Sequence, residues 1–251
     1  LGAAIAHALL KTGTISPERL WIANRSGARP PFSEYPQVNI TTDASQLAQA
    51  CDTILLSVPP ALFPEVAIKA HDKLVLSVMA GVTIAHMTKR TGASRLIRAM
   101  SSPAAELSLA YTPWCASPGV THKDRDTART LFEACGKTAE VANEDQIDYF
   151  TALTGPVPGF VAFFADAMIA DAIARDVPKA IADRAVRQLF HAAGVVLDST
   201  PKSPADHVEA MIAYAGTTAA GMLALRESPL ARAIAQGLDA AYRRAKTIAP
   251  P

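Results

Sequence analysis

The sequence lacks an excess of charge of either sign. Its 251 residues include 24 Lys and Arg against 23 Asp and Glu, a net charge of +1. A nucleic-acid footprint normally shows as a basic patch or a high isoelectric point, so we do not expect nucleic-acid binding. The length is compatible with two modest domains, and a hydrophobic fraction of 50% is enough for a sizeable core.

Long apolar runs are also absent. No stretch reaches the roughly 20 uncharged apolar residues that cross a bilayer, and no segment has the pattern of a signal peptide. The most apolar segment, 160–174, is interrupted by Asp166 and Asp171, which predicts a buried helix in water. We therefore expect no association with a membrane.

Cysteine is scarce, and its three positions are far apart. Cys51, Cys115 and Cys135 form no CxxC pair and have no histidine close by. This pattern favours reduced thiols in a cytoplasmic protein over a disulfide framework or a zinc site. The six histidines are scattered without the spacing of metal ligands, so we expect no metal site.

The first half of the chain alternates between β-rich runs and segments with helical spacing. The runs at 53–58 and 74–78 barely alternate in polarity, as expected for strands buried on both faces of a parallel sheet. This βαβ rhythm predicts an open, doubly wound α/β domain. Strands are predicted at 19–24, 53–58, 74–78, 95–100 and 138–142, and helices at 2–12, 43–51, 61–71, 84–91 and 122–135.

The second half is predicted to be all-helical. Three prolines, Pro178, Pro204 and Pro229, stand where helices tolerate proline, at their first turn. We therefore divide the chain into an α/β domain over 1–143 and a helical domain over 144–251. The helix at 158–175 carries apolar residues on more than one face, which predicts a homodimer through this half. Helices are predicted at 144–153, 158–175, 178–197, 204–213, 217–226 and 228–248.

Two segments of the first half point to a dinucleotide. Gly2, followed by small residues, fits the third glycine of a GxGxxG fingerprint, which permits close packing of helix and strand. The strand and first two glycines of that fingerprint are absent from the printed sequence, so a plain helix with a chance glycine stays open. At the end of the next strand stand Asn24, Arg25 and Ser26, where an NAD site usually has an acidic residue. A guanidinium and a hydroxyl suit a phosphate, which favours NADP, with a solvated turn as the alternative.

Taken in order, seven segments resemble motifs of the pyrroline-5-carboxylate reductase family. Pro59 stands where the family has a lysine, and Ser101 and Ser102 replace its Pro-Asn pair. The resemblance covers nearly the whole chain. The segments are LGAAIAHALL, ANRS, LLSVPP, SVMAGVTI, RLIRAMSSPAA, TALTGPVPGFVAFFADAM and AYAGTTAAGMLALRE.

This resemblance implies a Rossmann-like NADP-binding domain, a helical dimerisation domain and NADPH-dependent reduction of a cyclic imine. It places Thr218 beside the imine nitrogen, with Gly216 and Thr217 holding the substrate carboxylate. Ordinary helix capping is the alternative role for the two threonines.

The resemblance also assigns contacts to NADP(H) along the strand ends. Val58 and Pro59 would pass under the dinucleotide, Ala80 and Gly81 would let its backbone approach closely, and Ser102 would lie beside the nicotinamide.

Departures from the family motifs concentrate at the substrate. The family's GSGPAY is Gly155-Pro156-Val157-Pro158-Gly159-Phe160 here, and Tyr214 lies where its SPGG motif is altered. Pro156 and Tyr214 thus predict a more apolar pocket and a different or larger imine. The remaining alternatives are another NADP-dependent oxidoreductase of this architecture and a non-catalytic NADP-binding protein. A β-hydroxyacid dehydrogenase is disfavoured, because the segment 160–174 contains no lysine.

Overall fold

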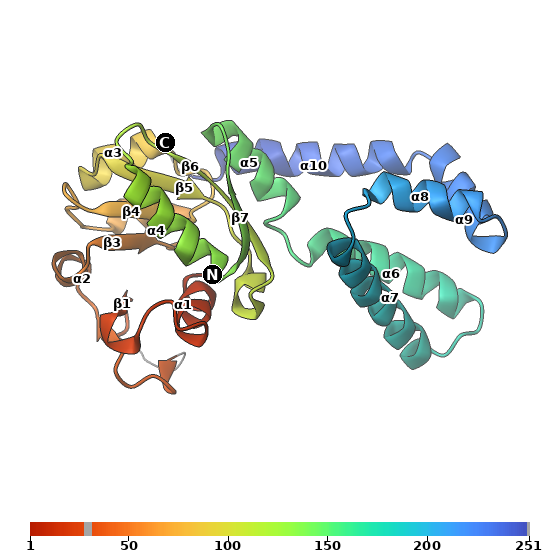
Figure 1. Cartoon of the computed structure of the whole chain (residues 1–251), viewed down its shortest axis with the longest axis horizontal. Coiled ribbons are helices and arrows are strands. Elements are labelled where there is room, and N and C mark those ends of the chain that lie inside the picture. The colour runs from red at the N-terminus through yellow and green to blue at the C-terminus, as the bar shows by residue number, and fades with distance from the viewer. Residues whose placement is uncertain (28–31, 250–251) are drawn as a thin grey trace. The chain divides into compact units, whose positions relative to one another are not determined.

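The fold is described from a computed structural model, which places residues 1–27 and 32–249. The chain forms two compact units (Figure 1): residues 1–156 together with 239–251, and residues 157–238. The predicted class is confirmed, because a Rossmann-like sheet domain is followed by helices. The predicted domain boundary between residues 143 and 144 stays a prediction.

The main sheet has five strands in the order β3-β4-β5-β6-β7. The first three run parallel, β6 is antiparallel to β5, and β7 is parallel to β6. A separate parallel pair is formed by β1 and β2. The bounds are β1 Trp21–Ala23, β2 Asn39–Thr41, β3 Thr53–Leu56, β4 Leu74–Ser77, β5 Arg95–Ala99, β6 Ala110–Ala116 and β7 Gly136–Glu140.

Helices cover both faces of the main sheet because neighbouring strand residues point to opposite sides. Leu74 and Leu76 pack with Ile97 beneath α1 (Gly2–Lys11) and α4 (His122–Glu133). Val75 and Leu96 face the other way and pack against α2 (Ala44–Ala50) and α3 (Ile84–Thr91). The doubly wound arrangement follows from this alternation.

Two strands were missed, and one predicted helix was wrong. Strands β2 and β6 had not been predicted; β6 contains Pro113, which has no N–H to donate. The predicted helix over 61–71 is only a short 3-10 helix, η3 (Pro60–Glu65), followed by irregular chain. Pro64 lies inside η3 and removes an amide that an α-helix would need.

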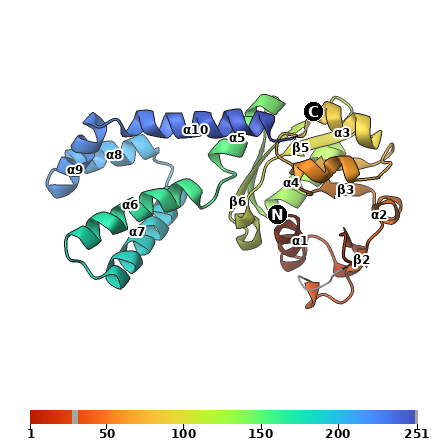
Figure 2. The same ribbon diagram turned by 180° about the vertical axis from the view of Figure 1, so that it is seen from behind.

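The second unit consists of helices. Helix α6 (Gly159–Ala174) contacts α7 (Lys179–Ser199), and α8 (Pro204–Ala213) contacts α9 (Thr217–Glu227). Both pairs can be followed in Figure 2. Helix α10 (Leu230–Thr247) starts in this unit and ends in the first, where α5 (Glu144–Leu153) packs on β5 and β6. No helix in the described part of the chain is both long enough and apolar enough to span a membrane.

Candidate functional site

The predicted cofactor segments follow the carboxyl ends of parallel strands. Val58 and Pro59 follow β3, Ala80 and Gly81 follow β4, and Ser102 follows β5. These three strands are neighbours in one sheet, so the segments share one edge. In open α/β sheets, ligands bind in the crevice outside this edge.

Gly2 begins α1 at a point of close approach to the chain after β3. A Cβ built on Gly2 would lie 3.1 Å from the Cβ and the Oγ of Ser57, closer than ordinary van der Waals contact. Helix and strand thus meet here at a separation that a larger side chain would disturb. This packing is the role that a GxGxxG fingerprint gives to its third glycine.

The segment after β1 offers a cation and a hydroxyl. Arg25 is 71% exposed, and its guanidinium lies 3.6 Å from the carboxylate of Glu65, which is 66% exposed. The Ser26 hydroxyl donates a hydrogen bond to the side-chain oxygen of Asn24 at 3.3 Å. An exposed ion pair of this kind is weak and screened by salt. The donor set fits the 2′-phosphate of NADP, which a guanidinium and a hydroxyl can both bind.

Ser102 is buried at the end of β5, where it precedes the 3-10 helix η4 (Pro103–Leu107). Its neighbour Ser101 shares a hydrogen bond with Thr112 of β6 at 2.9 Å between hydroxyl oxygens. Within residues 1–27 and 32–249 no hydrogen bond to the Ser102 hydroxyl is found. That hydroxyl can therefore serve a ligand, whereas the hydroxyl of Ser101 holds the strands together.

Gly81 is a turn residue with a φ of +72°, a conformation that favours glycine. A Cβ at this position would lie 2.8 Å from Cγ2 of Ile248 and 2.9 Å from the carbonyl oxygen of Ala245. The close approach that we predicted for the dinucleotide is thus also made by the end of α10. A side chain on Gly81 would force this segment away.

Sequence reasoning missed a buried ion network beneath this edge. Arg98 of β5 is 1% exposed and donates hydrogen bonds to Glu144, at 3.1 Å, and to Asp148, both on α5. The Glu144 carboxylate also accepts from the backbone amide of Ile84 at 2.8 Å, at the start of α3. The network therefore joins β5, α3 and α5. The available signal was an arginine inside an otherwise buried run, since arginine is almost never fully buried unless paired.

A second cluster holds α10 on α5. Asp145 accepts a hydrogen bond from the Tyr242 hydroxyl at 2.6 Å and lies 2.5 Å from the Lys246 ammonium group. The hydrogen bond from Lys246, then that from Tyr242, lowers the pKa of Asp145 below its ordinary value. These contacts fix the end of α10 beside the Gly81 turn.

The two buried cysteines are poor nucleophiles. Burial raises the pKa of Cys115 to about 12, and the nearby Glu144 carboxylate adds to the effect. Burial alone raises the pKa of Cys135 to about 11. Since the thiolate is the reactive form, both side chains are inert at neutral pH.

In the second unit, the predicted substrate residues surround the start of α9. Gly216 is the residue before the helix, with a φ of +85°, and Thr217 and Thr218 are its first two residues. No side chain among the described residues caps the first turn, and both threonines are exposed. Tyr214, at the end of α8, is 88% exposed.

Pro156 belongs to the first unit, and it is exposed in the turns that follow α5. Gly216, Thr217, Thr218 and Tyr214 belong to the second. The roles of all five residues stay predictions.

Comparisons with known proteins agree with this division of features. Residues 144–248 match the family model described as pyrroline-5-carboxylate reductase dimerisation, and residues 1–81 match that of NADP oxidoreductase, coenzyme F420-dependent. Pyrroline-5-carboxylate reductase from Synechocystis is 28% identical over 250 residues, which are 98% of this chain and 93% of that protein. Together these matches support membership of the pyrroline-5-carboxylate reductase family.

Solved reductases of this family share the fold. The structure from Coxiella burnetii aligns with a TM-score of 0.87 at 24% identity, covering 99% of this chain and 94% of that one. The Plasmodium falciparum reductase, solved with NADP bound, aligns with a TM-score of 0.81 at 19% identity, covering 99% and 94%. The predicted resemblance is thus confirmed, and its site residues remain to be tested.

Proposed function

We propose that this chain is an NADPH-dependent reductase of a cyclic imine, with pyrroline-5-carboxylate, reduced to proline, as the first substrate to test. The observation that carries the proposal is the exposed, uncapped start of α9 at Gly216–Thr218 in a member of this family. Free backbone amides at a helix N-terminus are a ready anion site, suited to a substrate carboxylate.

The cofactor supplies a hydride from its reduced nicotinamide when it is bound. Arg25 and Ser26 hold its 2′-phosphate, while Gly2, Asn24, Val58, Pro59, Ala80 and Gly81 shape the crevice along the strand ends, and Ser102 offers a hydroxyl to the nicotinamide. These groups act by positioning, which is worth several kcal/mol in such reactions.

On the substrate side, the Thr218 hydroxyl donates a hydrogen bond to the imine nitrogen as electron density arrives there. The amides that follow Gly216, together with Thr217, hold the carboxylate. A donor aimed at developing charge contributes about 10²-fold or more to the rate when it is preorganised.

One observation favours a substrate other than pyrroline-5-carboxylate. Tyr214, two residues before Gly216, is 88% exposed, and Pro156 replaces a hydroxyl-bearing residue of the family motif. Pro156 removes a donor and Tyr214 adds an aromatic ring in place of a proline, which suits a larger or less polar imine.

We also propose that the protein is a homodimer through its helices and that it works in the cytoplasm. No residue of α6 is buried in the single chain, although the helix carries apolar residues on more than one side. Phe163 is 75% exposed and Val161 53%. Large exposed apolar patches mark interaction sites, and the family model matched here is one of dimerisation.

The test follows the loss of reduced-nicotinamide absorbance with NADPH and NADH. Its substrates are pyrroline-5-carboxylate, a six-membered carboxylated imine and an uncarboxylated imine. Thr218→Ala and the isosteric Thr218→Val should lower kcat by about 10²-fold, whereas Thr218→Ser should retain most of it. NADPH affinity, measured separately, should stay unchanged in all three variants. Binding of NADPH without turnover of any imine by the parent protein would refute the enzymatic proposal in favour of a non-catalytic NADP-binding protein.

A further inference from the structure

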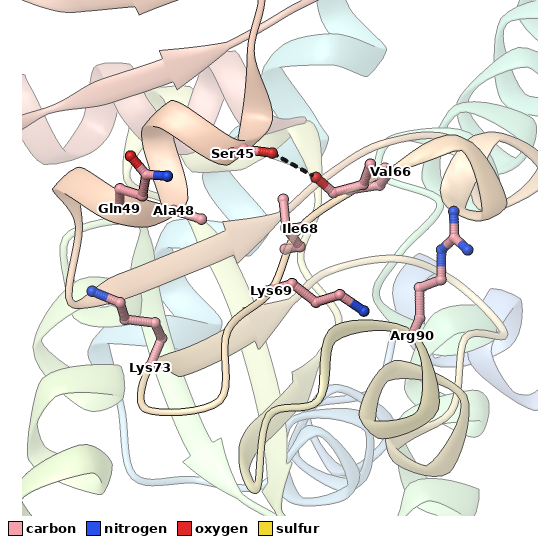
Figure 3. A pocket seen from close by; sticks show the side chains of 9 residues that line it. Ser45, Ala48, Gln49, Val66, Ile68, Lys69, Lys73 and Arg90 are labelled. Carbon is pink, nitrogen blue, oxygen red and sulfur yellow. Dashed lines mark hydrogen bonds between the residues drawn. The ribbon is translucent and has the colours of Figure 1, made fainter.

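The chain has a pocket that the proposed function does not use (Figure 3). It encloses about 740 Å³, a volume in the range of small-molecule sites. We call it the basic pocket. Its walls come from α2, from the chain after η3, from the start of β4 and from the end of α3. The lining residues are Ser45, Ala48, Gln49, Val66, Ala67, Ile68, Lys69, Lys73 and Arg90.

The pocket exists where a predicted helix is missing. Residues 66–70 are irregular chain in place of the helix predicted over 61–71. The Ser45 hydroxyl of α2 donates to the carbonyl of Ala67 at 3.2 Å, which fixes one wall (Figure 3). The amides of Ala67, Ile68 and Lys69 have no hydrogen-bond partner among the described residues.

The charge of the pocket is one-sided. Lys69, Lys73 and Arg90 line it, and none of the nine lining residues is acidic. Lys69 has no ion-pair partner in the described part of the chain. The Lys73 ammonium lies 4.0 Å from the carboxylate of Asp52, whose side chain is fully exposed. Arg90 donates only to the carbonyl of Pro64. A chain with a net charge of +1 thus gathers three weakly compensated cations here.

We propose that the basic pocket binds a small organic anion with two or more negative charges, from phosphate or carboxylate groups, on a short apolar body. Lys69 extends toward Arg90 on one side of the pocket, and Lys73 lies with Gln49 on the other (Figure 3). This arrangement suits charges at two ends of a ligand. Ala48, Val66 and Ile68 offer apolar contact between them. Clefts lined by one sign of charge also raise the local concentration of oppositely charged ligands.

The test measures heats of binding by isothermal titration calorimetry at constant ionic strength, with inorganic pyrophosphate and citrate as probes. Pyrophosphate represents phosphate ligands and citrate represents carboxylate ligands. At least one probe should bind the wild-type protein, and Lys69→Gln and Arg90→Gln should each weaken that binding by about tenfold. Lys89→Gln is the matched control, because Lys89 is exposed on the same helix as Arg90 but does not line the pocket. It should bind like the wild type.

Two further arms separate this pocket from the cofactor crevice. Binding of the probe should persist when the protein is saturated with NADP⁺, and it should persist in Arg25→Gln. Loss of probe binding in either arm, equal affinities in wild type and Lys69→Gln, or no binding of either probe at millimolar concentration would overturn the proposal. Arg90→Gln also removes a hydrogen bond to the carbonyl of Pro64 and can disturb the chain there. Lys69 has no ion pair or side-chain hydrogen bond among the described residues, so Lys69→Gln tests the pocket without this effect.

Discussion

Replacing Arg98 with methionine should destabilise the first unit by about 3 kcal/mol. The side chain is 1% exposed, and both of its carboxylate partners lie on α5. Removing one member of a buried ion pair typically costs 3–5 kcal/mol, because a charge is left without compensation. We expect a loss at the lower end of this range, because Glu144 is 33% exposed and keeps its hydrogen bond from the Ile84 amide. Only Asp148, which is 13% exposed, then loses its main partner.

Tryptophan fluorescence during urea unfolding isolates this effect. The two tryptophans, Trp21 and Trp114, both lie in the first unit. Trp114 is buried on β6 and pairs with Ala99 of β5, one residue beyond Arg98. The fluorescence transition therefore reports the unit that contains the network, whatever the helical unit does.

Arg129→Met is the matched control. Arg129 also has an aspartate partner at 3.0 Å, but the two side chains are 51% and 69% exposed. Such pairs contribute about 0.2–1 kcal/mol, so this variant should change little. The double variant Arg98→Met/Asp148→Asn should recover at least about 1 kcal/mol relative to the sum of the single changes, because it removes the stranded charge as well. A loss below about 1 kcal/mol for Arg98→Met, or strict additivity of the two changes, would refute the reasoning.

Three further predictions address the cofactor, acid stability and assembly. Glu65→Gln frees Arg25 from a competing carboxylate, so KM for NADPH should fall by up to about fivefold with KM for NADH unchanged; equal effects on both would count against the assigned phosphate site. Burial of Asp124 acts to raise its pKa, but hydrogen bonds from Thr121 and contact with Arg95 outweigh it and hold the pKa below the ordinary value. The difference in free energy of unfolding between wild type and Asp124→Asn, measured from urea midpoints, should therefore be largest at pH 7 and shrink as the pH falls below about 4. A difference that does not depend on pH would contradict this. Phe163→Glu should shift the protein from dimer to monomer in sedimentation, whereas Lys179→Glu, at an exposed polar residue, should not.

Strands β3 and β4 of the main sheet could be predicted because apolar residues occupy most of their positions. In the run 74–78 only Ser77 is polar, and in 53–58 only Thr53 and Ser57 are, so neither run alternates regularly in polarity. Strand β2 has only three half-buried residues and leaves no such signal. The segment 61–71 has helical spacing, yet Pro64 limits it to the short 3-10 helix η3, so local backbone chemistry prevailed over apolar periodicity there.

In the candidate site, too, some residues could be predicted from the sequence and others could not. Residues that follow strands, such as Pro59 and Gly81, could be placed from motif order alone, because a parallel sheet brings strand ends to one edge. The ion pairs and hydrogen bonds of α5 could not be predicted from the sequence. Arg98 and Asp148 are 50 positions apart, and Tyr242 and Asp145 are 97 apart. Nothing local in the sequence couples such residues, so only the packing of α5 on the sheet reveals them.

Composition alone does not show that the two units bury very different shares of their apolar residues. Half of the chain is hydrophobic, which suggested a large core. In the second unit, however, only Ala182, Val186 and Ala219 are buried hydrophobic residues. Its remaining apolar side chains lie on helix surfaces, where a lone chain would expose them to water. Burying such surface is worth about 25 cal/mol per Å², so the helical unit gains most of its hydrophobic stabilisation only when a second surface covers it. For this unit, assembly and folding thus draw on the same residues, and Phe163→Glu should lower its thermal stability as well as its mass in solution.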